Sequence, residues 1–213
     1  MIILINGSER EKYSYFINQM HRIRAEVFHD RLGWNVKVKD GLEIDEFDAL
    51  NPLYVISIDE NSNRVLGSLR LLPTTGKNML RDVFYDLLGE NEIVESPTIW
   101  ESSRFSISNS APSPTEGRLL SRTTGELFCA LAEIGLKAGL TEIMTVFDAR
   151  MIRIIRAAGC EIISLGRPKR IGVCMTYAGL FETTETALEN IRKACGITDS
   201  VLEPQSARRL FAA

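Results

Sequence analysis

The sequence lacks the features that mark membrane-spanning, secreted and disulfide-stabilised proteins. Its longest uninterrupted apolar runs, at 1–5 and 127–132, have only five and six residues, whereas a helix that crosses a bilayer needs roughly 18. No basic stretch leads into an apolar segment, so we expect no secretory signal. The 4 cysteines form no C-x-x-C pair, and the 2 histidines are too few to complete a zinc site. We therefore expect a cytoplasmic protein with free thiols, no metal and no membrane span.

A strong net charge is also absent. The 25 Lys and Arg residues face 28 Asp and Glu residues, so the net charge of −3 offers no overall field for binding nucleic acid. With 213 residues, 45% of them apolar and 25% charged, the chain has the composition of one globular domain. We expect a single domain over 1–213, with the tail from about 196 to 213 loosely ordered.

Hydrophobic periodicity predicts an α/β (α+β) fold with a mostly antiparallel central sheet flanked by helices. Strand patterns occur at 1–6, 53–58, 64–72, 98–107, 142–147, 161–165 and 171–177. Helical patterns occur at 9–31, 79–88, 115–138, 148–158 and 184–194. Residues 33–51 show no period and carry five acidic residues, which indicates a long functional loop.

Two arginines stand where periodicity predicts burial. Arg24 lies within the apolar stripe of its helix, and Arg70 shares a strand face with Leu66 and Leu72. A lone buried charge is costly, so each arginine should have a partner or a ligand. The acidic stretch at 43–48 could supply the carboxylates.

The strand at 98–107 carries two more charges. Alternation places Glu101 on one face with Phe105, and Arg104 on the other face with Trp100. Two interpretations are open: structural ion pairs that fasten the acidic loop to the sheet, or a pocket for a ligand that bears both charge signs. The second interpretation accounts better for the group as a whole.

These positions resemble the signature of the LuxI-type acyl-homoserine-lactone synthases, a family of autoinducer synthases. The matching residues are Arg24, Phe28, Trp34, Asp45, Asp48, Arg70, Glu101 and Arg104, in the same order and spacing. The surrounding strings at 20–24, 69–73 and 100–105 fit as well, and the resemblance covers roughly residues 1–180. Within the family, the sequence is most similar to the TraI-like branch of plant-associated bacteria.

The resemblance implies a GNAT-like acyltransferase fold and a specific reaction. The enzyme would take S-adenosylmethionine and an acyl thioester, usually on acyl carrier protein, acylate the methionyl amine and close the lactone. It would release 5′-methylthioadenosine and make a diffusible quorum-sensing signal. S-adenosylmethionine enters as a substrate, and no further cofactor is implied.

The residue types suit that substrate. A sulfonium favours aromatic rings, an ammonium favours carboxylates and a carboxylate favours arginines. Six residues are therefore assigned to the S-adenosylmethionine side: Arg24, Phe28, Trp34, Asp45, Asp48 and Arg70. Glu101 is the candidate general base, because burial raises the pKa of a carboxyl towards the useful range. Backbone N–H groups near Ser103, Arg104 and Phe105 are the candidate oxyanion donors.

Later elements carry the residues assigned to the acyl group. Candidate walls of the acyl pocket are Met144, Thr145, Phe147 and Met151, although a core face would look the same. In the family, a threonine that matches Thr145 tends to accompany 3-oxo-acyl products, which favours such a chain here.

A local basic set follows these residues. It consists of Arg150, Arg153, Arg156, Lys169 and Arg170. The arginines at 150–156 recur every three residues and share a helix face, which is either a solvated face or a docking surface for the acidic acyl carrier protein. The same charges would suit the phosphates of acyl-coenzyme A, so the identity of the donor stays open.

Two other functions fit the sequence less well. A coenzyme-A-dependent N-acyltransferase of the same fold class would carry a Gly-rich phosphate turn after the central strand, but 108–118 contains only Gly117. A regulator that binds nucleic acid would need a recognition motif that the chain does not show.

Overall fold

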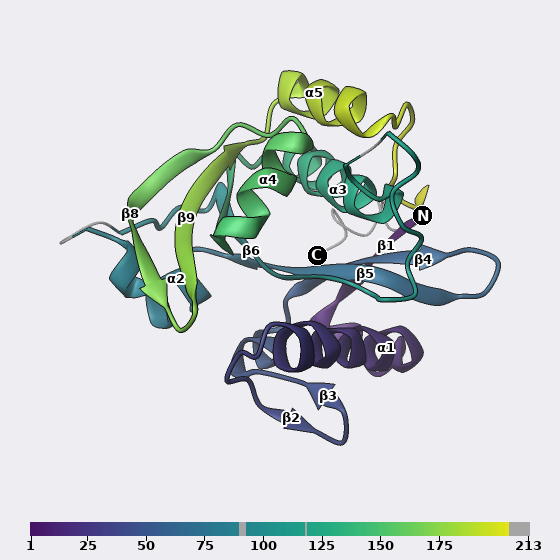
Figure 1. Cartoon of the computed structure of the whole chain (residues 1–213), viewed down its shortest axis with the longest axis horizontal. Helices are drawn as coiled ribbons and strands as arrows, with labels where there is room; N and C mark the ends of the chain where they lie inside the picture. The colour runs from purple at the N-terminus through teal and green to yellow at the C-terminus, as the bar shows by residue number, and fades with distance from the viewer. Residues whose placement is uncertain (90–92, 118, 205–213) are drawn as a thin grey trace.

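A mixed sheet lies at the centre of the protein (Figure 1). The structure is a computed structural model that describes residues 1–89, 93–117 and 119–204. The strands of the sheet are β1 (Ile2–Asn6), β4 (Leu53–Asp59), β5 (Arg64–Pro73), β6 (Ile99–Ile107), β7 (Glu142–Asp148), β8 (Ile163–Ile171) and β9 (Cys174–Glu182). They lie in the order β1-β4-β5-β6-β7-β9-β8, antiparallel throughout except between β6 and β7. The predicted fold class and the mostly antiparallel sheet are confirmed.

Helices cover both faces of this sheet. They are α1 (Ser14–Arg24), α2 (Met79–Asp82), α3 (Arg122–Ala138), α4 (Ala149–Ala157) and α5 (Glu185–Cys195), with shorter turns η1 (Gly7–Glu9), η2 (Ala25–Arg31), η3 (Glu46–Leu50) and η4 (Tyr85–Leu87). In Figure 1, α1 and a small hairpin of β2 (Val38–Lys39) and β3 (Leu42–Glu43) lie on one side of β4 and β5, whereas α3, α4 and α5 lie on the other. None of the helices in the described ranges is long and apolar enough to span a membrane.

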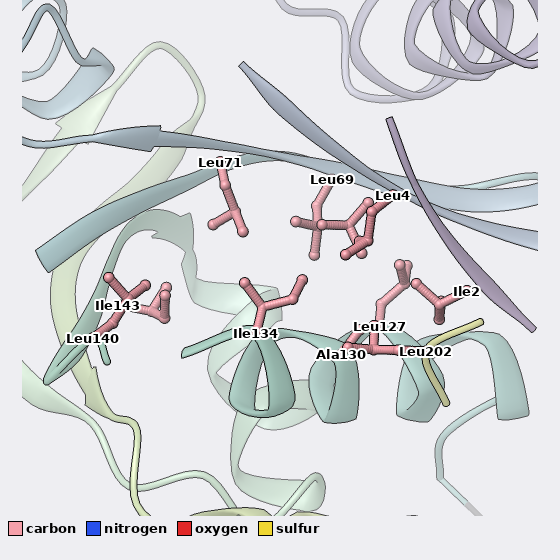
Figure 2. Packing of buried hydrophobic residues seen from close by; sticks show 11 residues of the cluster. Ile2, Leu4, Leu69, Leu71, Leu127, Ala130, Ile134, Leu140, Ile143 and Leu202 are labelled. Atoms are coloured by element: carbon pink, nitrogen blue, oxygen red, sulfur yellow. The ribbon is translucent and has the colours of Figure 1, made fainter. Parts of the chain in front are cut away.

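Aliphatic side chains fill the layer between the sheet and α3. Figure 2 shows the strand residues facing the helix residues: Ile2, Leu4, Leu69 and Leu71 against Leu127, Ala130 and Ile134. Burial of each of the larger side chains contributes about 1.5–3 kcal/mol. This layer therefore fixes the part of the sheet on which the site is built.

The α3 helix begins later than its pattern predicts. We expect Thr115 as the N-cap, but Ser121 caps the helix, its Oγ accepting a hydrogen bond from the Thr124 N–H at 3.2 Å. Gly117, with a φ of 79°, turns the chain between the two candidate caps. The predicted end at Gly139 is confirmed, because this residue adopts the left-handed conformation of a helix C-cap.

The last hairpin is longer than the strand patterns at 161–165 and 171–177 predict. Its first strand, β8, lies at the edge of the sheet, and its residues Arg167, Lys169 and Arg170 are exposed. Charged side chains are common on edge strands, where they discourage pairing with another chain. They also interrupt the alternation of apolar and polar residues by which a strand is recognised in a sequence.

The C-terminal segment makes regular contacts with β1 and α3. The Ile2 N–H donates to the Val201 carbonyl at 2.9 Å, and the Glu203 N–H donates to the Ile2 carbonyl at 2.8 Å. Buried Glu133 of α3 accepts a hydrogen bond from the Val201 N–H at 3.2 Å. The expectation of a loosely ordered tail does not describe this stretch, and the part of the tail at 205–213 lies outside the described residues.

The parallel strands β6 and β7 separate halfway along their length. They pair only from Ile99 to Ser102 and from Glu142 to Thr145. Beyond these residues β6 stays paired with β5, and β7 stays paired with β9. The two strands therefore diverge, and the candidate site lies at this divergence.

Gly166 fits β8 closely against η4. It has a φ of 55°, and a Cβ at this position would overlap the Leu87 carbonyl oxygen. Gly172, in the turn between β8 and β9, has a similar φ of 58°, but a Cβ there would meet nothing within 4 Å.

We predict that Gly172→Ala lowers the free energy of unfolding by about 1 kcal/mol through backbone strain. Gly166→Ala should lower it by about 1–3 kcal/mol more, because η4 must move to make room for the Cβ. Urea unfolding measures both values, and equal losses would contradict the close fit.

Candidate active site

A cavity of about 1290 Å³ lies where β6 and β7 diverge. Its walls come from η2, the acidic segment at 43–47, β6, β7, α3 and α4. Charged side chains of the acidic segment and β6 line it, as do apolar side chains of α3 such as Phe128 and Leu131. A ligand with a charged head and an apolar chain suits such a lining.

A β-bulge in β6 changes the direction of the side chains at this site. Between the pairs Ser68–Ser106 and Arg70–Ser103, β6 contains one residue more than β5. Arg104 lies in this bulge with a φ of 56°, an unfavourable value for a residue other than glycine. Bulges of this kind re-aim side chains next to active sites.

The bulge exchanges the faces that alternation predicts. Arg104 turns to the side of α2, where Glu101 also lies, and Phe105 turns to α3, where its ring lies 5.4 Å from that of Phe128. The predicted grouping of Arg104 with Trp100, and of Phe105 with Glu101, is therefore wrong. One inserted residue reverses a pattern that has a period of two.

Buried ion pairs hold the acidic segment against α1 and the sheet. Arg24, only 1% exposed, donates to both carboxylate oxygens of Asp48 at 2.8 and 2.9 Å, and through Nε to Glu43. The Tyr54 hydroxyl also donates to Asp48, at 2.9 Å. Although burial alone would favour the protonated acid, Arg24 and Arg70 hold the pKa of Asp48 well below its usual range. The carboxylate is therefore ionised and fixes the arginines in place.

A second arginine joins the network from β5. Arg70 donates to both Asp45 and Asp48, and its Nε donates to the Ser103 Oγ at 3.1 Å. Asp45 and Asp48 also form a reciprocal capping box at the start of η3. The acidic segment is thus ordered by local capping and by ion pairs with distant residues.

Arg104 completes the network at the cavity wall. Its guanidinium lies 3.1 Å from a Glu43 oxygen, 2.8 Å from an Asp45 oxygen and 5.2 Å from the centre of the Phe28 ring. Burial lowers the pKa of Arg104, while Glu43 and Asp45 oppose the shift. Phe28 belongs to the π-helical turn η2, a conformation common at functional sites. Its ring lies 5.2 Å from that of Trp34, so both predicted aromatics stand beside the charged wall.

The arginines differ in their access to the cavity. Arg104 and Asp45 line it, whereas Arg24, Arg70 and Asp48 do not border it and lie behind the residues that do. The structure therefore places Arg24, Arg70 and Asp48 one layer behind the cavity wall, and their assignment to the S-adenosylmethionine side stays a prediction.

The network and Glu101 together carry one net negative charge when all groups are ionised. The positive members are Arg24, Arg70 and Arg104, and the negative members are Glu43, Asp45, Asp48 and Glu101. Because these side chains are largely buried, solvent screens the imbalance only weakly. The wall therefore favours a ligand with a net positive charge.

Glu101 lies against the start of α2. Its two carboxylate oxygens accept hydrogen bonds from the Met79 and Leu80 N–H groups at 2.8 and 2.7 Å. The side chain borders the cavity although it is only 1% exposed. Burial raises the pKa of this carboxyl, and this effect outweighs the opposite influence of the two N–H groups and of the nearby arginines. A raised pKa suits a general base.

All four predicted catalytic residues border the cavity: Glu101, Ser103, Arg104 and Phe105. Cys160 borders it too, but burial raises the pKa of its thiol to about 12, which argues against a thiolate nucleophile. The described residues contain no group of three or more side chains arranged to hold a metal ion.

Three of the four predicted acyl-pocket residues line the cavity: Thr145, Phe147 and Met151. Met144 does not, because alternation along β7 turns it into a separate hydrophobic cluster on the other side of the sheet. The Thr145 hydroxyl donates to the Ser102 carbonyl at 2.7 Å. Its proton is thus engaged by the backbone of β6, and the 3-oxo preference inferred from Thr145 stays a prediction.

The predicted basic set lies beside one side of the cavity. Its exposed members are Arg150, Arg153, Arg156, Lys169 and Arg170. Arg150 borders the cavity, and its Nη2 lies 3.8 Å from the Cys174 Sγ, so α4 meets the β8–β9 hairpin there. Arg150 is the member of the set that borders the cavity, whereas Lys169 of β8 lies 3.5 Å from Asp86 of η4.

Two residues of the site have no role assigned from the sequence. Glu43 bridges Arg24 and Arg104, and the Met79 Sδ lies 3.4 Å from both the Arg70 and the Arg104 guanidinium. The acidic composition of the loop points to Glu43 in general terms. Nothing in the helical pattern around Met79 distinguishes it from an ordinary core residue.

Comparisons with known proteins agree with this geometry. Residues 8–191 match the family model described as autoinducer synthase. The chain is 36% identical over 190 residues to an acyl-homoserine-lactone synthase of Agrobacterium fabrum, covering 89% of this chain and 90% of that protein. It is 38% identical over 174 residues to one of Pseudomonas aeruginosa, covering 81% and 85%.

Solved structures show the same relationship. A CoA-dependent acyl-homoserine lactone synthase, MesI, superposes with a TM-score of 0.82 at 26% identity, covering 96% of this chain and 100% of that one. The synthase LasI superposes with a TM-score of 0.75 at 32% identity, covering 91% and 93%. The expected GNAT-like acyltransferase fold is confirmed, and the chain belongs to the autoinducer synthase family of acyl-homoserine-lactone synthases.

Proposed function

We propose that this protein makes an N-acyl-L-homoserine lactone from S-adenosylmethionine and an acyl thioester, and releases 5′-methylthioadenosine. The observation that carries the proposal is the charged wall of Glu43, Asp45, Glu101 and Arg104, in which carboxyl groups outnumber the guanidinium, next to an aromatic pair and continuous with an apolar cavity. S-adenosylmethionine bears a sulfonium, an ammonium and a carboxylate, so its net charge is complementary to that of the wall. Membership of the autoinducer synthase family supports the same reaction.

In this proposal each charged group of S-adenosylmethionine has a counterpart on the cavity wall. Phe28 and Trp34 face the sulfonium, an attraction of up to roughly 2 kcal/mol when water is excluded. Asp45 attracts the ammonium and Arg104 binds the carboxylate. The residues behind the wall hold these groups in position.

Acylation begins when the amine loses a proton. We assign the proton to Glu101, through a water molecule, because its carboxyl pKa is raised and it borders the cavity. The neutral amine attacks the thioester carbonyl, and backbone N–H groups of the bulge at 103–105 stabilise the oxyanion. The carbon–sulfur bond of the tetrahedral intermediate then breaks, the departing thiolate takes the second proton of the nitrogen and leaves as a thiol, and an amide remains.

Lactone closure is an intramolecular displacement. The substrate carboxylate attacks the carbon bonded to the sulfonium, the carbon–sulfur bond breaks, and the electron pair stays on sulfur in 5′-methylthioadenosine. Holding the two reacting atoms in line can supply several kcal/mol of the barrier.

The reaction is tested by mass spectrometry of mixtures of the purified protein, S-adenosylmethionine and acyl thioesters of several chain lengths. Formation of an acyl-homoserine lactone together with 5′-methylthioadenosine is the expected result. An acylated amine without lactone would indicate an ordinary N-acyltransferase and contradict the proposal.

We predict that Glu101→Gln lowers kcat at least about 100-fold, the usual contribution of a general base. Because burial raises the pKa of Glu101, kcat of the parent should fall as the pH drops, at values above the ordinary range of a glutamate. This acidic limb should vanish in the variant. Glu133→Gln is the matched control, since Glu133 is an equally buried carboxylate outside the cavity. Parental turnover in Glu101→Gln would exclude Glu101 as the base.

We further propose that the acyl donor is acyl carrier protein, and that the reaction takes place in the cytoplasm. The basic set on α4 and β8 supports this donor, because it is exposed, begins at the cavity with Arg150 and belongs to a protein with a net charge of −3. The relative MesI is described as CoA-dependent, which makes acyl-coenzyme A the alternative donor.

We predict that Arg150→Glu combined with Arg153→Glu raises the KM for acyl carrier protein at least about tenfold, through lost electrostatic attraction. The KM for S-adenosylmethionine should not change. Lys12→Glu combined with Arg64→Glu makes the same change in net charge on exposed residues remote from the cavity, and should leave both constants unchanged. The same acyl group supplied on coenzyme A shows which carrier the parent prefers. An unchanged KM for acyl carrier protein would show that the α4 arginines do not dock this partner and form an ordinary solvated helix face.

A further inference from the structure

Met79 connects the arginine network to Glu101. Its Sδ lies 3.4 Å from the Arg70 Nη2 and 3.4 Å from the Arg104 Nη1, while its N–H donates to the Glu101 carboxylate at 2.8 Å. The residue is 6% exposed and borders the cavity. One side chain thus touches both the cationic and the acidic part of the site.

The Met79 sulfur is the weakest of the hydrogen-bond acceptors around Arg104. The Nε and Nη2 groups of this arginine face the carboxylates of Glu43 and Asp45. Within the described ranges, the recorded acceptor of Nη1 is the Met79 Sδ. A thioether is a weak acceptor, whereas hydrogen bonds between ions are strong. Nη1 is therefore the group that an incoming anion can take with the smallest loss.

We propose that Met79 is a replaceable acceptor for the substrate carboxylate site. Before the substrate binds, its sulfur accepts from the Arg104 Nη1 and the Arg70 Nη2, and on binding the Arg104 Nη1 passes to the carboxylate of S-adenosylmethionine. This inference rests on the proposed function. It follows that a stronger acceptor at position 79 competes with the substrate, whereas an apolar side chain leaves the N–H groups unsatisfied until the substrate arrives.

Two substitutions separate this role from packing. Met79→Leu keeps the approximate volume and removes the acceptor, while Met79→Gln supplies an amide oxygen. Calorimetric titration with S-adenosylmethionine alone should give a dissociation constant several-fold lower for Met79→Leu and about tenfold higher for Met79→Gln, a change of about one hydrogen bond. Free Met79→Leu should also melt at a lower temperature than the parent and gain more from the ligand.

Met144→Leu is the matched control. Met144 is a buried methionine that packs against Leu80, the neighbour of Met79, but does not border the cavity. The Met144→Leu variant should bind S-adenosylmethionine with the dissociation constant of the parent. Binding by Met79→Leu that is equal to or weaker than that of the parent would overturn the proposal, as would shifts in the same direction for both Met79 variants.

A measurement on the parent covers the case in which Met79→Leu does not fold. Labelling the methionine methyl groups with carbon-13 gives signals from 6 residues, and Met79→Gln identifies the one from Met79. Adding S-adenosylmethionine should shift the Met79 signal and leave the Met144 signal in place, whereas an unmoved Met79 signal in the saturated enzyme would overturn the proposal. Failure of the parent to make lactone would contradict the proposed function instead, so the two failures are distinct.

Discussion

The site depends on the need to neutralise guanidinium groups that the fold has buried. Arg24 and Arg70 are at most 1% exposed, so each must keep carboxylate partners within contact distance. Removing one partner of a buried ion pair costs about 3–5 kcal/mol, because the remaining charge is left uncompensated. The acidic segment spans the end of β3 and the start of η3, and Phe47 is its one buried apolar side chain. Its position is therefore set mainly by these charges, and it forms a wall of the cavity because the arginines hold it there.

The same network compensates for the backbone of the bulge in β6. A left-handed conformation costs a residue such as Arg104 roughly 1–2 kcal/mol. Contacts with Glu43 and Asp45 offset that cost. The bulge lies just beyond Ser102, where β6 leaves β7, so the divergence of the strands and the placement of the cavity-lining arginine occur together. The bulge thus accompanies both the opening between β6 and β7 and the position of Arg104 at the cavity wall.

Much of this site could be predicted from the sequence, because charges on apolar faces stand out against periodicity. Arg24, Arg70 and Glu101 were identified in this way, and all three are buried and partnered in the structure. The positions that matched the family signature placed them in a known reaction. The periodicity depends on local sequence alone, and the signature depends only on the order and spacing of residues along the chain.

The remaining features depend on relationships that local sequence does not contain. Alternation cannot reveal the extra residue that turns Arg104 to the side of α2 and Phe105 towards α3. Likewise, no local pattern shows that Arg104 borders the cavity while Arg70 lies behind it. Nor does local sequence show that residues 201–203 contact β1 and α3, because their partners, Ile2 and Glu133, lie far away in the sequence.

The proposed reaction makes opposing demands on the carboxylate of S-adenosylmethionine. It must be held while the amine is acylated, and it must then act as a nucleophile, which a strong ion pair would suppress. In the proposed site Arg104 would meet both demands, because Glu43 and Asp45 already compensate its charge and its attraction for a third carboxylate is moderate. Met79 fits the same logic, because its weak acceptor can leave the guanidinium and return to it without a large change in free energy. Since its N–H also binds Glu101, one short helix sets the distance between the carboxylate site and the base.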